Sequence, residues 1–163
     1  MYFIIKTVNN IYERMCNIMN ESNELILHVY QDAEMACFTL DQLINDLKEK
    51  DNKIKKILED IFKEYETWKQ KTKRILQKEN EEISQNPLIA KIMAGQSIKK
   101  EVKNDNSDSA IADLLIKGIS MGTIDMDKKI RAYQEEASKD DLQIAKDFLK
   151  FQEKTIAHLK EYL

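Results

Sequence analysis

Apolar residues recur every three or four positions over four long stretches of the chain, which is the period of one face of an α-helix. The stretches predict helices over about Asn23 to Lys50, Asn52 to Ser84, Asp108 to Ala137 and Ser138 to Leu163. Ser138 with Asp141 three residues later resembles a capping box, so the last helix is expected to begin there. Asp51 is the expected N-cap of the second helix.

Most positions on the inward stripes are apolar, as a packed core requires. In chain order they are Leu25, Val29, Asp32, Ala36, Leu40, Leu43, Leu47; Ile54, Leu58, Ile61, Tyr65, Trp68, Thr72, Ile75, Leu76; Ile111, Leu115, Gly118, Gly122, Asp125, Met126, Lys129, Tyr133; Leu142, Ala145, Phe148, Leu149, Gln152, Ile156, Leu159 and Leu163. The two glycines inside the third helix indicate either a close approach between helices or a kink that leaves a recess for a ligand.

The connections between the predicted helices differ in length. One or two residues join the first two helices, and a short break joins the last two, so each pair should be antiparallel. Between the pairs, a short helical turn from Leu88 to Met93, closed by Gly95, leads into the polar stretch 96–109. Such a connection can travel the full length of a bundle. The pattern therefore predicts an all-α four-helix bundle over residues 22–163, with a long crossover between its second and third helices.

Residues 1–21 are interpreted as an extension of this domain. Ile4, Val8, Ile11, Met15 and Ile18 follow helical spacing, so the extension is compatible with a helix.

Composition supports long helices and removes several classes of function. The 163 residues include three Gly and one Pro, and 34% are charged with both signs mixed, giving a net charge of −3. This charge pattern does not favour nucleic acid, and no apolar run has the length of a membrane span. Cys16 and Cys37 have no metal-ligand spacing and no neighbouring base, so a reducing, cytoplasmic location is expected, and nucleophilic catalysis finds no support.

The helix order with one long crossover resembles the ferritin-like superfamily over about residues 22–163. That resemblance implies a dinuclear centre held by inward carboxylates and two Glu-x-x-His motifs, and no such motif occurs in this sequence. Tyr65 with Trp68, and Gln152 with Thr155, stand at the inward spacing where the motifs would lie. The expectation is therefore no metal, no cofactor and no catalytic residue.

Six inward positions carry polar or amphipathic side chains that form a candidate core cluster: Asp32, Tyr65, Trp68, Asp125, Lys129 and Gln152. A buried carboxylate needs a hydrogen-bonding partner, which Tyr65, Gln152 or Lys129 can supply to Asp32. The cluster is interpreted either as a polar network that fixes helix register or as the floor of a small-ligand pocket.

Apolar residues beside the inward stripe of the last helix predict a partner surface, made of Ile144, Phe151, Thr155 and Tyr162. The favoured function is a non-enzymatic structural or protein-binding bundle that forms a homodimer or binds another protein. The alternatives are a metal-handling or redox protein with an atypical site near Asp32 and Asp125, and a helical adaptor or immunity-type protein.

Overall fold

The chain is helical throughout the part that the structure describes. The computed structural model describes the backbone of residues 2–79, 83, 86 and 88–163, and side chains of residues 23–79, 83, 86 and 90–163. Within these residues it contains α1 (Tyr2–Asp46), α2 (Lys55–Lys78), α3 (Leu88–Asn104), α4 (Asp108–Tyr133), α5 (Lys139–Leu159) and a closing 3₁₀ turn (Lys160–Tyr162), with no strand. The all-α class is therefore confirmed. None of these helices combines the length and apolarity that crossing a membrane requires.

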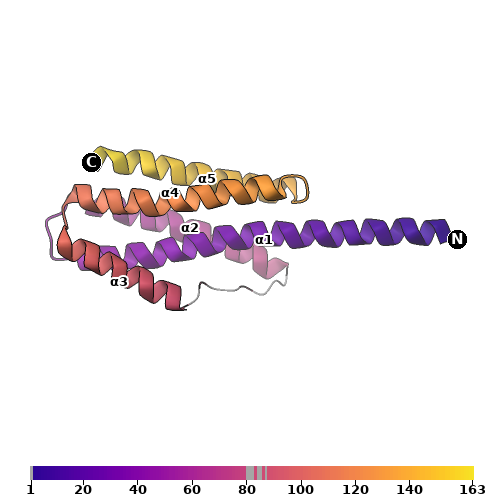
Figure 1. Ribbon diagram of the computed structural model, residues 1–163, viewed down its shortest axis with the longest axis horizontal. Coiled ribbons are helices and arrows are strands. Elements are labelled where there is room, and N and C mark those ends of the chain that lie inside the picture. The colour runs from indigo at the N-terminus through magenta and orange to yellow at the C-terminus, as the bar shows by residue number, and fades with distance from the viewer. Residues whose placement is uncertain (1, 80–82, 84–85, 87) are drawn as a thin grey trace.

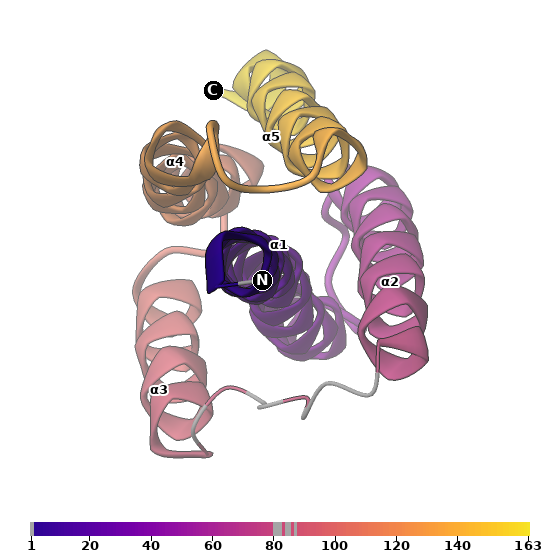
Figure 2. The same cartoon turned by 90° about the vertical axis from the view of Figure 1, so that its right-hand side faces the viewer.

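Helix α1 is the element around which the others are arranged. It contacts α2, α3, α4 and α5, and it lies between them in Figure 2. Figure 1 shows that α1 and α2 run in opposite directions, as do α4 and α5, and that α2 and α4 run the same way. The connection from α2 to α4 must therefore return along the bundle, and α3 forms much of that return.

The first prediction that the structure corrects concerns the crossover. Gly95 was expected to end a short turn, but α3 continues through it to Asn104. A Cβ at position 95 would collide with the side-chain amide of Gln42 on α1, so this glycine allows a close approach of two helices. Two buried residues one turn apart, Ile98 and Val102, attach α3 to the core.

The second correction concerns the start of α1. The segment Asn20 to Asn23 was read as a break before the first bundle helix, yet one helix of 45 residues runs through it. No Gly or Pro interrupts the segment, and Asn and Ser cost at most about 0.7 kcal/mol each inside a helix. The extension and the first bundle helix are thus one element.

Polar caps fix several of the helix ends. At the start of α5, the amide of Asp141 donates to the Ser138 hydroxyl at 3.1 Å, which confirms the predicted cap. Asp51 does not cap α2, because that helix begins only at Lys55 and its N-cap residue makes no side-chain bond. Instead, the Asp108 carboxylate accepts from Asn52 Nδ2 at 2.7 Å and from the Lys53 amide at 3.1 Å, which ties the α1–α2 turn to the start of α4.

The core follows the predicted stripes closely. Its fully buried members come from α1, the α1–α2 turn, α2, α4 and α5 and include Leu25, Leu40, Leu43, Leu47, Ile54, Leu58, Tyr65, Ile111, Met126 and Phe148. Leu163, also expected inside, is 63% exposed because it follows the last turn of the chain. A second, smaller cluster joins Ile26 and Tyr30 of α1 to Leu76 of α2.

The N-terminal part of α1 projects beyond the other helices (Figure 1). The hydroxyl of Tyr133, the last residue of α4, donates to the Glu24 carboxylate on α1. Because α4 ends beside Glu24, the α1 residues that precede Glu24 extend past that end of α4.

Candidate functional site

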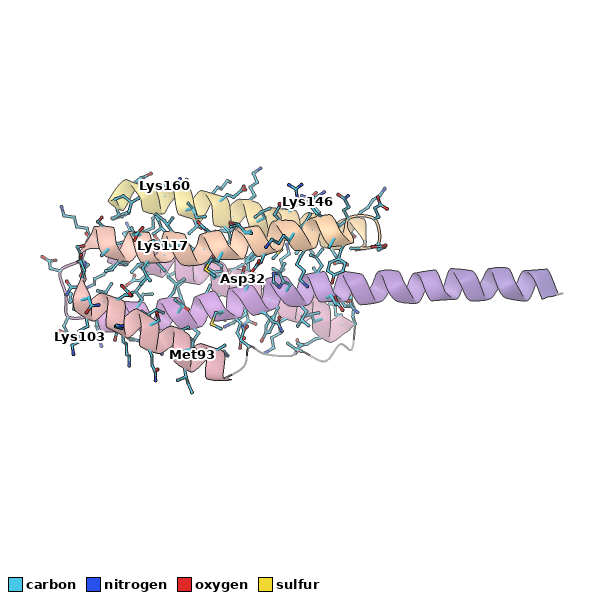
Figure 3. All side chains as sticks on the ribbon, viewed as in Figure 1. Asp32, Met93, Lys103, Lys117, Lys146 and Lys160 are labelled. Carbon is cyan, nitrogen blue, oxygen red and sulfur yellow. The ribbon has the colours of Figure 1, made fainter. Side chains whose placement is uncertain are left out.

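The strongest polar contact across the interior joins Asp32 of α1 to Gln152 of α5. The Gln152 amide Nε2 donates to Asp32 Oδ2 at 2.8 Å. Gln152 is 1% exposed, and Figure 3 labels Asp32 where α1 faces α4. The structure thus brings together two of the six residues of the candidate core cluster and supplies the carboxylate with a donor.

Gly122 of α4 provides the space for this pair. A Cβ added at this glycine would lie 2.9 Å from Asp32 Oδ2 and 3.1 Å from Gln152 Nε2, which are the two bonded atoms. At Gly118, one turn earlier, an added Cβ would meet no atom within 4 Å. Of the two roles considered for these glycines, Gly122 therefore serves a close approach, while Gly118 borders open space.

Tyr65 and Trp68 of α2 belong to an aromatic cluster that joins α2 to α5. The Tyr65 ring lies 4.8 Å from that of Phe151, and the Trp68 ring lies 5.4 Å from that of Phe148, measured between centroids. Both contacts are close to edge-to-face, the arrangement that the ring quadrupoles favour. The inward position where a Glu-x-x-His motif would place ligands is therefore filled by packed rings.

Burial dominates the electrostatics around Asp32. It raises the pKa of the Asp32 carboxyl, and the hydrogen bond from Gln152 and the nearby His28 only partly oppose that shift. Burial also lowers the pKa of His28, with Asp32 opposing the change. For Tyr65, burial and then the neighbouring Asp32 charge raise the pKa of the hydroxyl. The site therefore disfavours every charge that it holds.

Asp125 and Lys129 do not join the Asp32–Gln152 pair. The Asp125 side chain is 61% exposed and lies 3.6 Å from Lys128 Nζ in an ion pair. Lys129 Nζ lies 5.5 Å from the centroid of the Tyr133 ring. Asp125 does border a small cavity of about 210 Å³ together with His28 and Asp32. Among the described residues, no three His, Cys, Asp or Glu side chains gather so as to hold a metal ion.

The predicted partner surface on α5 is not one exposed patch. Thr155 is 4% exposed and its hydroxyl donates to the Phe151 carbonyl at 3.0 Å. Phe151 and Tyr162 pack against the main core, and Ile144 packs against the smaller cluster. The apolar arc of α5 is wide because the helix packs on both the α2 aromatics and α4.

The sequence analysis missed a second polar centre, on the side of α1 that faces α3. Glu34, which the helical period turned away from the bundle core, is 9% exposed. Its carboxylate accepts from Lys91 Nζ at 2.5 Å and from the amide and side chain of Asn86 at 3.0 and 2.8 Å. Although burial acts in the opposite direction, these hydrogen bonds hold the pKa of Glu34 below its usual value.

A groove of about 400 Å³ opens between α1, α3 and α4, directly over the Asp32–Gln152 pair. Its walls are largely apolar and include Met35, Ile98, Leu114, Leu115, Ile119 and Met121, and its deepest polar residues are Asp32, Tyr65 and Gln152. The signal in the sequence was Gly118, which faces this space.

Comparisons of the chain with protein-family models, with curated proteins and with solved structures found no match.

Proposed function

We propose that this chain is a non-catalytic helical module whose role is to bind protein, and that it assembles with a second copy through the projecting part of α1. The observation that carries the proposal is the length of α1. Its 45 residues span about 67 Å at 1.5 Å per residue, whereas the 26 residues of α4 span about 39 Å.

The sequence of the projecting part supports a packed role. Ile4, Val8, Ile11, Met15 and Ile18 follow alternating spacings of four and three residues, which is the seam of a coiled coil. Beside the seam, at the position that widens it into a bundle-type stripe, stand Ile5, Tyr12 and Met19. This stripe has the width that the helices of the bundle use to pack on one another.

A helix of this length has little stability by itself. Isolated helices are marginal in water even when their sequences favour helix, because most helical stability in proteins comes from packing one apolar face. A second copy presents an identical stripe, and a symmetric pair of such stripes is self-complementary. We therefore assign the partner of this stripe to another molecule of the same chain.

The proposal includes the ferritin-like relationship. It is supported by the order of helix directions, in which α2 and α4 run the same way and a long connection separates two antiparallel pairs (Figure 1). The interior is filled by Tyr65, Trp68, Phe148 and Phe151 where ferritin-like metal proteins place ligands, which favours a module without redox chemistry.

Sedimentation equilibrium of the full chain tests the assembly. Val8→Glu with Met15→Glu places two charges in the seam, and Asn10→Glu with Asn17→Glu places the same charges on the opposite face. We expect the wild type and the opposite-face variant to sediment at twice the chain mass of 19.2 kDa, and the seam variant at that mass. A wild type that stays monomeric, or a seam variant that still dimerises, contradicts the proposal.

Elemental analysis separates this module from a metal-handling protein. Protein purified without chelator should contain Fe, Mn and Zn well below one atom per chain, and stoichiometric metal would contradict the proposal.

A further inference from the structure

The groove over Asp32 and Gln152 combines apolar walls with an unsatisfied polar floor. Gln152 is 1% exposed, and although its Nε2 is bonded to Asp32, its Oε1 has no hydrogen-bond partner among the described residues. An amide oxygen buried without a donor costs about 1 to 3 kcal/mol, so natural proteins rarely leave one unless something else supplies the donor. Gln152 lines the groove, so a molecule in the groove is placed to supply that donor.

The carboxylate beside it points to the same kind of partner. The bond from Gln152 occupies one of the two oxygens of Asp32, and a carboxylate can accept up to about four hydrogen bonds. Both remaining groups on the floor are acceptors and one of them carries negative charge. A head group that fits them is therefore a donor with positive charge.

The walls define the rest of the molecule. Met35, Ala36, Leu40, Ile98 and Leu115 line the groove with hydrocarbon, and its volume of about 400 Å³ lies within the usual range for small-molecule sites. The mouth is open at α4, where Met121 is 69% exposed and a side chain at Gly118 would meet no atom within 4 Å.

We propose that this groove binds a small primary amine with an apolar body, whose ammonium group donates to Asp32 and to Oε1 of Gln152. An ammonium has three donors and can serve both residues at once, while its hydrocarbon part lies against the walls. An alcohol with the same body brings one donor and no charge, and a carboxylate of the same size is repelled by Asp32. This site is independent of the assembly through α1.

Calorimetric titration of the full chain at neutral pH tests the site. The probes are phenethylamine, phenethyl alcohol and phenylpropanoate, which share an aromatic body and differ in head group. We expect saturable binding of the amine in about the micromolar to millimolar range, and binding of the other two weaker by about tenfold or more. No saturable heat with the amine, or equal affinity for all three probes, would overturn the proposal.

Two substitutions locate the binding. Gly118→Leu fills the open side of the groove and should abolish amine binding, while Ala132→Leu, an equal enlargement at an exposed position of α4, should leave it unchanged. Asp32→Asn keeps the shape of the floor but removes its charge, so the preference for amine over alcohol should disappear. Circular dichroism confirms that each variant is folded. Amine binding that survives Gly118→Leu in a folded protein would refute the assignment to this groove.

Discussion

The two glycines of α4 allow the packing around Asp32 to be tested by one substitution made at two places. Replacing a helical glycine with alanine stabilises a helix by about 0.5 to 1 kcal/mol, because glycine loses more backbone entropy on folding. At Gly118 the added methyl group meets no atom within 4 Å, so Gly118→Ala should realise this gain.

At Gly122 the same methyl group would lie 2.9 Å from Asp32 Oδ2 and 3.1 Å from Gln152 Nε2. These atoms form a hydrogen bond of 2.8 Å, so moving either of them away weakens the bond. Overpacking costs about 1 to 3 kcal/mol and a hydrogen bond to a charged group contributes about 1.5 to 3 kcal/mol. After the helical gain is subtracted, Gly122→Ala should destabilise the protein by about 1 to 2 kcal/mol.

The two variants should therefore differ by about 2 to 3 kcal/mol. For a protein of this size, 1 kcal/mol corresponds to a Tm change of about 2 to 4 °C, so their melting temperatures should lie about 4 to 12 °C apart, on opposite sides of the wild type. Thermal unfolding followed by circular dichroism measures this at one fixed protein concentration, because assembly makes Tm depend on concentration. Equal shifts in the same direction would refute the packing described around Asp32.

Two further predictions concern buried carboxylates. Asp32→Leu should keep the helical content and change Tm, and complete loss of folding would contradict a role in helix register. Because the folded-state pKa of Asp32 is raised, its contribution to stability falls as pH rises from about 4 through that raised value. Urea unfolding should thus show Asp32→Asn gaining stability relative to the wild type over that window, and a constant difference would be inconsistent with a buried, titrating carboxyl. Glu34 has the opposite sign: its lowered pKa gives stability that is present above pH about 4.3 and is lost as pH falls through the folded value. Glu34→Gln should cost about 1 to 3 kcal/mol at neutral pH and less in acid, whereas a pH-independent cost would exclude the ion pair with Lys91 as its source.

Features that depend on neighbouring residues could be read from the sequence. The start of α5 is an example, since Ser138 and Asp141 form their cap within one turn. Position along a helix also placed Asp32 and Gln152 on inward faces, and their pairing follows from packing α1 against α5.

Features that depend on distant segments could not be read in this way. The helical period correctly turned Glu34 away from the main core, but it could not reveal that Lys91 and Asn86 would cover that face. The meaning of Gly95 likewise depends on Gln42, a residue on another helix. For Asp125, assigned inward by its period, the structure has the side chain pairing with Lys128 on the exposed surface of the same helix.

Hydrogen exchange of the backbone amides of residues 4–18, measured at two protein concentrations, tests the central claim most directly. If the projecting part of α1 is a helix held by a second copy, these amides are protected at high concentration and lose protection on dilution, while those of α2 and α5 do not change. Exchange at the rate of an unstructured chain at both concentrations, or protection that does not depend on concentration, would contradict the claim.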